Sequence, residues 1–508
     1  MKTKIGINLI FIMLFFWIGC TDDLEYIPID QLTTERIMGD LDLLQTATYA
    51  NYARGRQSPA TFMRLSELQS DDNIMMRWSS NNMSNTLTYL QIVNNANAAS
   101  WWQNSYRTIF ACNVIIEAIT DDDNAEMLNL KGENIWMRAQ YHFDLVRIFG
   151  RPFSHDNPET NLGIPLCDNT DVYAMPSRAT VKETYEFIEK DLLRAAELLT
   201  ITLSNVYVSK EVVWATLARL YIYWDKYDKA IEYANKVINS GRYGLLSTEQ
   251  LPTCYLLTPE EDSEAIFAVK FRPEENQGLS SKGTMWHRDG GWGELMVTKT
   301  LMDLLWKNKD DDQRIKYIDP HYKYDADGNK IPDPTEPYYG YALNDRMGLL
   351  SYHCLKFTKE QGINMLHSPR LYRLAEMYLI KAEAHAKLGQ DQLALDNVNL
   401  IRTRAGLSGD QLFRLDNLQG YTSILDIVLD EKRMEFFQEA HRAYDVFRNK
   451  RTLDRTYCQW QGWSGPPYIP YWSNRILHFV PEREMTINPN LVQNPDLEPL
   501  EDLPTSMP

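Results

Sequence analysis

The spacing of apolar residues predicts pairs of amphipathic helices along much of the chain. Between residues 371 and 382 the apolar side chains recur at intervals of three and four, which places them on one helix face; they are Leu371, Leu374, Ala375, Tyr378, Leu379 and Ala382. A second face, from Ala394 to Ala405, ends at Gly406, and glycine commonly follows the last residue of a helix. Two helices joined by the short break at 388–390 form a unit of the TPR-like type.

The same spacing recurs in the N-terminal half. The helices expected there cover residues 101–119, 133–149, 181–199, 217–224 and 230–237. Alternation typical of strands is scarce, with 265–271 as a short example. Because one helix pair cannot bury its apolar face alone, successive pairs are expected to stack. We therefore predict an all-α fold, a TPR-like helical-repeat solenoid with long loop-rich insertions.

Two stretches interrupt the helical pattern, roughly 242–368 and 450–508, and both are rich in Gly, Pro, Trp and Tyr. Long ordered loops on a rigid scaffold often carry binding residues. We expect residues 41–508 to form a single domain. Its N-terminal, TPR-containing half covers about 41–241, and the loop-rich insertion with the C-terminal half covers about 242–508.

The N-terminus has the pattern of a secretory signal peptide. Two lysines precede an apolar run at 5–18, and Cys20 follows a glycine. The run is shorter than the roughly twenty residues that span a bilayer. A cysteine at this place indicates bacterial lipoprotein processing, with residues 1–19 removed, Cys20 acylated and 20–40 as a surface tether. Ordinary cleavage at another bond is the alternative, because Trp17 stands where such signals usually have Leu.

Charge and cysteine content narrow the class of protein. The formal net charge is -17, so no nucleic acid is expected as a partner. Beside Cys20, five widely spaced cysteines remain without a CxxC pair; they are Cys112, Cys167, Cys254, Cys354 and Cys458. This pattern argues against a disulfide framework and against a zinc site. We expect mostly buried free thiols.

Six motifs have the order and the residue types of one known family. They lie at 138–150 (RAQYHFDLVRIFG), 374–384 (LAEMYLIKAEA), 399–407 (NLIRTRAGL), 430–435 (DEKRME), 439–448 (EAHRAYDVFR) and 488–495 (NPNLVQNP). Over essentially the whole mature chain, the sequence resembles the SusD/RagB family of Bacteroidetes outer-membrane nutrient-binding lipoproteins. The acidic segment 21–25 is similar to their surface-export signal. The departures are Ala440 and Asp496, where the family usually has Gly.

The charged residues of these motifs are expected to be structural. They lie on amphipathic helices at intervals of three and four, where opposite charges pair within and between helices; they are Arg402, Arg404, Glu431, Arg433, Glu435, Arg442, Asp445 and Arg448. His142 lies on an apolar stripe and is interpreted as a core histidine. The proline-containing tail is expected to pack as an extended strap across the solenoid.

The resemblance implies a function in nutrient import. Members of the family are surface lipoproteins that cover a TonB-dependent transporter of the SusC type and pass glycans or peptides to it. We therefore expect a glycan ligand, a SusC-like partner and attachment to the outer membrane through the lipid anchor. Import of peptides with the same architecture, as in RagB-like proteins, is the first alternative. A TPR-type scaffold that binds only proteins is the second.

Glycan binding needs aromatic faces that stack on sugar rings and polar groups that pair with hydroxyls. Three loop regions carry both. The candidate ligand residues are Asp72, Arg77, Trp78 and Asn81 in the first loop, Trp286, His287, Arg288, Asp289 and Trp292 in the second, and Tyr338, Tyr339 and Tyr341 in the third. Packing or transporter contact is the alternative for each loop. A fourth aromatic run, 460–472, is interpreted equally well as packing.

No catalytic motif is recognised in the sequence. The chain lacks a Walker loop, a GxGxxG after a strand, HExxH and a GxSxG elbow. A glycosidase would need two carboxylates across a cleft, and no spacing identifies such a pair, so we expect a binding protein and not an enzyme. The segment 325–329 resembles part of a calcium loop but lacks its closing Glu. A hairpin turn explains it better; no cofactor is expected, and a structural calcium ion is the alternative.

Overall fold

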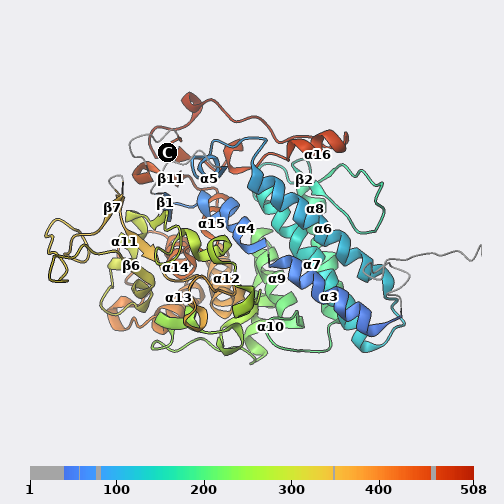
Figure 1. The fold of residues 1–508 in the computed structure, drawn as a ribbon, viewed down its shortest axis with the longest axis horizontal. Helices are drawn as coiled ribbons and strands as arrows, with labels where there is room; N and C mark the ends of the chain where they lie inside the picture. The colour runs from blue at the N-terminus through green and yellow to red at the C-terminus, as the bar shows by residue number, and fades with distance from the viewer. Residues whose placement is uncertain (1–38, 57, 76–81, 347–348, 459–464, 508) are drawn as a thin grey trace, which may run out of the picture.

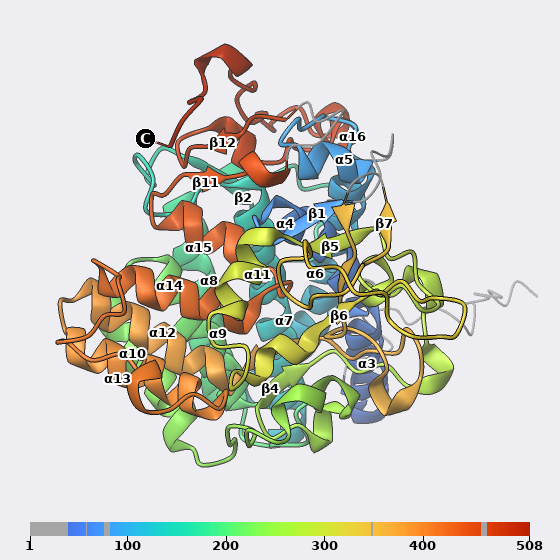
Figure 2. The same ribbon diagram turned by 90° about the vertical axis from the view of Figure 1, so that its left-hand side faces the viewer.

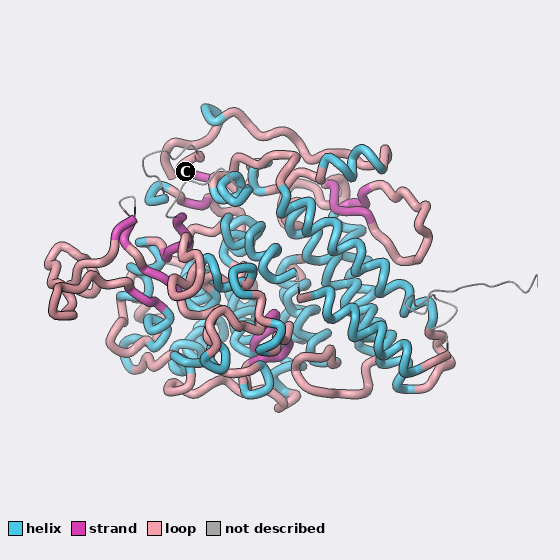
Figure 3. Tube along the Cα trace, viewed as in Figure 1, coloured by secondary structure: helices cyan, strands magenta, loops and turns pink. Residues whose placement is uncertain are grey.

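The computed structural model describes residues 39–56, 58–75, 82–346, 349–458 and 465–507. This part of the chain is mainly helical, with short strands and long loops (Figure 3). Its α-helices are α3 (Leu41–Gly55), α4 (Ser58–Ser66), α5 (Asn82–Leu87), α6 (Ala96–Ala118), α7 (Ala125–Phe149), α8 (Val181–Leu198), α9 (Lys210–Tyr223), α10 (Tyr227–Asn239), α11 (Lys299–Trp306), α12 (Leu374–Lys387), α13 (Asp391–Arg404), α14 (Ile424–Phe436), α15 (Arg442–Arg448) and α16 (Glu482–Ile487).

The strands are short and pair in twos. They are β1 (Asn73–Met75), β2 (Leu162–Pro165), β3 (Arg178–Thr180), β4 (Ala265–Ala268), β5 (Leu295–Val297), β6 (Ile318–Pro320), β7 (Asp345–Arg346), β8 (Leu349–Leu350), β9 (Tyr352–Cys354), β10 (Arg370–Arg373), β11 (Leu453–Asp454) and β12 (Tyr468–Ile469). The pairs are β1 with β5, β2 with β3, β4 with β10, β6 with β9, β7 with β8, and β11 with β12.

Helices that follow one another in sequence pack on one another. Helices α6 to α10 form one such series, and α10 contacts α12, which packs on α13 (Figures 1 and 2). Gly241 after α10 and Gly406 after α13 have positive φ angles of 69° and 105°, as their predicted place beyond a helix end requires. One predicted boundary is wrong. Leu371 lies in β10 and α12 begins at Leu374, because the backbone of β10 pairs with β4.

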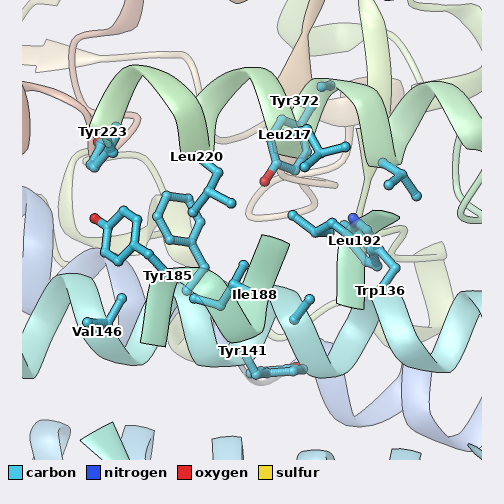
Figure 4. Close-up of a cluster of buried hydrophobic side chains, with 14 of the residues drawn as sticks. Trp136, Tyr141, Val146, Tyr185, Ile188, Leu192, Leu217, Leu220, Tyr223 and Tyr372 are labelled. Atoms are coloured by element: carbon cyan, nitrogen blue, oxygen red, sulfur yellow. The ribbon is translucent and has the colours of Figure 1, made fainter. Parts of the chain in front are cut away.

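Aromatic and aliphatic side chains from α7, α8 and α9 meet in one core (Figure 4). The buried residues labelled there include Trp136, Val146, Tyr185, Ile188, Leu192, Leu217, Leu220 and Tyr223. The indole Nε1 of Trp136 donates to Thr216 Oγ1 at 2.8 Å, which satisfies its polar atom. His142 is a core histidine, as predicted, and its Nδ1 donates to the Arg138 carbonyl at 2.8 Å. Burial lowers the pKa of His142 to about 3.

The motif charges form buried ion pairs between helices, as predicted. Glu431 of α14 accepts from Arg402 of α13 at 3.0 Å and from Arg314 at 2.6 Å. Within α15, Arg448 pairs with Asp445 at 2.6 Å. The remaining motif arginines form the pairs Arg404–Glu435, Arg433–Asp72 and Arg442–Asp71. These charges therefore connect α13 to α14, and they connect both α14 and α15 to the N-terminal region.

The C-terminal tail forms the expected strap across the N-terminal helices (Figure 1). Asn494 Nδ2 donates to the carbonyl of Phe149, the last residue of α7, at 2.9 Å. Its Oδ1 accepts from Arg178 Nη1 of β3, also at 2.9 Å. The tail is thus attached both to a carbonyl that the end of α7 leaves without a helical partner and to the side chain of Arg178.

The predicted signal peptide, Cys20 and the tether up to residue 38 lie outside the described residues. Within the described ranges, no helix is both long and apolar enough to cross a lipid bilayer. Four cysteines are free thiols; Cys112 and Cys354 are buried, and Cys167 and Cys254 are half-buried. The division of 41–508 into two halves stays a prediction.

Candidate functional site

Strands that border the three loop regions selected from the sequence, namely β1, β5 and β7, lie near one another on one side of the molecule (Figure 2). Strand β1, which leads into the first loop, pairs antiparallel with β5, which follows the second; Met75 lies opposite Leu295. Ile74 and Met296 form a small apolar cluster, and Leu349 of β8 packs against it. Because β7 and β8 follow the third loop, strand pairing and apolar contact bring all three regions together.

The described end of the first loop is structural. Asp72 is fully buried, and its Oδ1 accepts from Arg433 Nε at 2.6 Å. Burial raises the pKa of Asp72, although the Arg433 charge opposes that shift. The structure thus corrects the expectation that Asp72 contacts a ligand, because its carboxylate balances an arginine of α14. Arg77, Trp78 and Asn81 lie outside the described residues, and their role stays a prediction.

The two tryptophans of the second loop have opposite environments. Trp286 is fully buried, and its Nε1 donates to Asn73 Oδ1 at 2.8 Å. His287 is buried too. Neither side chain reaches an external ligand, which corrects the expectation for both. Trp292 is 53% exposed, and its Nε1 donates to the Leu279 carbonyl at 3.3 Å; this bond orients the ring at the surface.

Two glycines let the second loop fold back on itself. Gly290 and Gly293 have positive φ angles of 86° and 54°, which favour glycine. The turn allows Trp292 N to donate to the Thr284 carbonyl at 2.8 Å. A Cβ added at Gly293 would lie 3.0 Å from Arg288 Cα. The exposed tryptophan and the arginine of this loop are therefore held close together by the backbone.

A polar cluster joins the second loop to the segment that carries the third. Arg288 Nη1 and Asn344 Nδ2 both donate to Nδ1 of His321, at 2.5 Å and 2.6 Å. Since Nδ1 accepts hydrogen bonds, His321 is neutral; burial, and then the Arg288 charge, lower its pKa. Burial also lowers the pKa of His353, whose ring lies 6.3 Å from that of His321, to about 4. Arg288 and Asp289 are exposed at the surface.

The tyrosines of the third loop divide into packed and exposed residues. Tyr338 and Tyr339 are half-buried and pack edge-on against Trp306, with ring centroids 5.2 Å and 4.8 Å away. Tyr341 is 38% exposed and meets Tyr322 edge-on at 5.9 Å. The segment between β6 and β7 projects from the body of the molecule (Figures 1 and 3). Tyr341 is therefore the one of the three that is freest to meet a ligand.

The segment 325–329, within this projection, forms a hairpin turn. Asp325 N donates to the Asn329 carbonyl at 2.9 Å. The Asp325 carboxylate accepts from the backbone N–H groups of Asp327 and Asn329, at 3.0 Å and 2.9 Å. The carboxylate thus stabilises the turn itself, as the hairpin interpretation of this sequence predicted.

The exposed or half-buried side chains that these loops share are called the loop face. They are Arg288, Asp289, Trp292, His321, Tyr341 and Asn344. Aromatic surface and hydrogen-bonding groups occur together there, so this face can stack a ring and pair its polar substituents. Sequence reasoning missed His321, because a single histidine in a loop has no periodic or motif signal. Its contacts with Arg288 and Asn344 make it part of the face.

Two family models match the chain in succession. Residues 30–222 match the SusD-like model described as starch-binding and associating with the outer membrane, and residues 263–496 match the SusD/RagB model, described as the SusD family. Together they account for most of the sequence. This chain belongs to the SusD/RagB family. The family that the six motifs resembled is thereby confirmed.

Relatives and solved structures agree with this membership. The SusD-like protein P38 of Formosa agariphila is 24% identical over 420 residues, which are 77% of this chain and 78% of that protein. A SusD superfamily structure from Bacteroides thetaiotaomicron has a TM-score of 0.76 at 25% identity, over 90% of this chain and 100% of that one. A structure from Bacteroides vulgatus, provisionally named a sugar binding protein, has a TM-score of 0.75 at 26% identity, over 90% and 99%. The predicted TPR-like helical class is thereby confirmed.

Proposed function

We propose that this member of the SusD/RagB family is a cell-surface lipoprotein that binds an oligosaccharide or polysaccharide. It hands the glycan to a partner TonB-dependent, SusC-like transporter of the outer membrane. The family model for residues 30–222, described as starch-binding and outer-membrane-associated, supports both the ligand class and the location. The observation that carries the proposal is the loop face, where exposed Trp292 and Tyr341 accompany Arg288, His321 and Asn344.

The chemistry of the loop face suits a sugar. A pyranose ring has an apolar C–H face that stacks on an indole or phenol, and its edge carries hydroxyls that pair with fixed donors and acceptors. Trp292 leaves about half of its surface in water, and covering an exposed aromatic surface with a ligand is favourable. Arg288 offers a charged donor that strengthens hydrogen bonds to oxygen. Several weak contacts of this kind suit capture followed by transfer.

Affinity electrophoresis tests the ligand class. The chain from residue 21 on is run in native gels that contain neutral or acidic polysaccharides, starch among them. We expect retardation by at least one glycan. The Trp292→Ala variant should lose about 1–1.5 kcal/mol, a roughly five- to tenfold fall in affinity. Tyr173→Ala, which removes an 87% exposed aromatic side chain between β2 and β3, is the control and should bind as wild type.

Two results would overturn the glycan proposal. One is the absence of retardation by any glycan, and binding of a peptide mixture by the same protein would then favour peptide cargo. The other is equal binding by the Trp292 and Tyr173 variants. We propose a binding role without catalysis, so release of reducing sugar by the pure chain would contradict it.

The anchor and the transporter need their own experiments. In cells fed a labelled fatty acid, the wild-type chain should carry the label and Cys20→Ala should not. A large outer-membrane barrel should co-purify with the tagged, lipidated chain under mild detergent conditions. Failure to incorporate label would reject the lipoprotein, and purification without a barrel would reject the partnership.

A further inference from the structure

A cavity of about 340 Å³ lies between α3, α4, α7 and the chain around β4, and it shares no residue with the loop face. Its volume falls within the range of small-molecule sites, about 300–1,000 Å³. Aromatic side chains form much of the wall; they are Tyr49, Tyr52, Trp101, Trp136, Tyr207 and Phe267. The cavity can therefore hold an apolar body of moderate size.

Three tyrosines form a rigid entrance to this cavity. Tyr49 is 39% exposed, so the wall reaches the surface there. The rings of Tyr49 and Tyr52 each lie 5.7 Å from the ring of Tyr207. The Tyr52 hydroxyl donates to Glu133 Oε2 at 2.7 Å and accepts from Val208 N at 2.9 Å. Because these bonds fix Tyr52 from both sides, the entrance needs little ordering when a ligand binds.

The cations of the cavity wall differ in their partners; exposed Arg272 and half-buried Lys282 form no ion pair within the described residues. Arg56 pairs with Glu275 at 2.6 Å, and Arg219 pairs with Glu376 at 2.5 Å. Lys282 also lines the cavity, but no ion pair or hydrogen bond joins its ammonium to the rest of the described chain. The ammonium instead lies 3.9 Å from the centroid of the Phe357 ring. Its charge is therefore not balanced by a paired carboxylate of the described chain, and a bound anion can pair with it.

The surroundings of Lys282 keep it charged but poorly solvated. Burial lowers its pKa to about 8, and the charges of Glu439 and Glu67, with a smaller effect of Cys354, act in the opposite direction, while Lys356 lowers the pKa further. At neutral pH the ammonium therefore stays protonated. A charge removed from water interacts more strongly with an opposite charge than an exposed one does. An anion in the cavity would compensate for the lost solvation.

A second polar group of the wall lacks a partner. Trp101 is 2% exposed, and its indole Nε1 has no acceptor among the described residues. A buried donor that makes no hydrogen bond costs about 1–3 kcal/mol. An oxygen of a bound molecule would accept from it. Cations outnumber carboxylates on this wall, and Asp144 and Glu439, which also line it, are paired with arginine or lysine. The wall thus offers an excess of positive charge and one neutral donor beside a partly aromatic surface.

We propose that this cavity binds a small organic anion, with its carboxylate at Lys282 and an aromatic body along the tyrosine and tryptophan wall. This site is separate from glycan capture at the loop face. The cavity selects for a negative charge because Lys282 is unpaired and cations outnumber carboxylates on the wall, and for an aromatic body because several aromatic rings line it.

Calorimetric titration with two probes tests the site. The probes are 4-phenylbutanoate and its uncharged counterpart, 4-phenylbutan-1-ol, and the protein is the chain from residue 21 on. We expect wild type to bind the carboxylate at least tenfold more tightly than the alcohol. Lys282→Met should lose that preference. Trp101→Phe, which keeps an aromatic ring and removes the N–H, should bind the carboxylate about threefold or more weakly.

Lys381→Met is the matched control, because Lys381 is also half-buried beside an aromatic ring but lies outside the cavity. It should bind as wild type, and no variant should change glycan retardation. Equal affinity of wild type and Lys282→Met for 4-phenylbutanoate would overturn the proposal. So would equal affinity of wild type for the two probes, or no binding of the carboxylate.

Discussion

Replacing Glu383 of α12 by Gln tests how far buried charge holds the C-terminal helices together. The carboxylate is fully buried; Oε2 accepts from Lys432 Nζ at 2.9 Å and from Arg448 Nη2, and Oε1 accepts from Asn449 Nδ2 at 3.0 Å. Burial alone would raise the pKa of Glu383, but Arg448 and Lys432 outweigh it and hold the pKa well below its usual range. Glu383 is therefore ionised at neutral pH.

The size of the stability loss in Glu383→Gln follows from the buried positive charges that lose their partner. Lys432 and Arg448, with side chains only 3% and 4% exposed, would share the single carboxylate of Asp445. Removal of one member of a buried ion pair costs about 3–5 kcal/mol. Unfolding entropy is about 2 cal/mol/K per residue, so a chain of 508 residues has on the order of 1 kcal/mol/K. The Tm should fall by about 3–5 °C.

Differential scanning calorimetry at pH 7 measures this change. The double variant Glu383→Gln with Lys432→Met removes one charge of each sign and should recover at least half of the loss, since the two sites are coupled. Glu232→Gln, in an exposed pair with Lys236, is the control and should lower stability by less than about 0.5 kcal/mol. A Tm of Glu383→Gln within 1 °C of wild type would refute the reasoning.

The stabilisation that Glu383 supplies should depend on pH in one direction. Because the pKa of Glu383 in the folded chain lies below its ordinary value of 4.5, the stabilisation is present above about pH 4.5. It is lost as the pH falls further, since the unfolded chain takes up the proton first. The difference in Tm between wild type and Glu383→Gln should therefore shrink below about pH 4.5. A difference that stays constant down to pH 2.5 would contradict this account.

Three further predictions concern single side chains. Lys282→Met should raise the Tm at pH 7, because burial lowers the pKa of Lys282 to about 8 from an ordinary 10.5, so the charged lysine destabilises the folded chain. The gain in Tm should disappear as the pH rises from about 8 to about 10.5, since in this range the unfolded chain binds more protons than the folded chain. Trp286→Ala should cost about 3–5 kcal/mol by opening the core, whereas Trp292→Ala should cost less than about 0.5 kcal/mol in calorimetric unfolding. Gly406→Ala should lower the Tm more than Gly409→Ala. Both have positive φ angles, but a Cβ at Gly406 would lie 2.5 Å from a backbone oxygen, and at Gly409 it meets open space.

Each of these predictions has a result that would contradict it. For Lys282→Met it is a lower Tm at pH 7, or a gain that persists above pH 10.5. For the tryptophans it is an equal loss of stability in both variants. For the glycines it is an equal change in Tm.

Much of the helical fold was predictable because its signal is local. Apolar residues at intervals of three and four lie on one helix face whatever the rest of the chain does, and α13 accordingly ends just before Gly406. The motif charges were predicted to be structural for the same reason. Their partners were not predictable, because Arg433 pairs with Asp72, 361 positions away.

The site depended on tertiary structure to a greater degree. Trp286 and Trp292 belong to one loop, and the glycines beside Trp292 do not by themselves say which of the two rings is buried. Pairing of β1 with β5 brings Asn73 to the Nε1 of Trp286 and buries that ring, while two left-handed glycines leave Trp292 in water. Likewise, Lys282 has no carboxylate partner because Glu439 binds Lys356 and Arg373. Glu67 accepts instead from neutral groups, among them the backbone N–H of Ala440. Amphipathic helices are set by the sequence itself, whereas burial and charge pairing depend on residues that only the folded chain brings into contact.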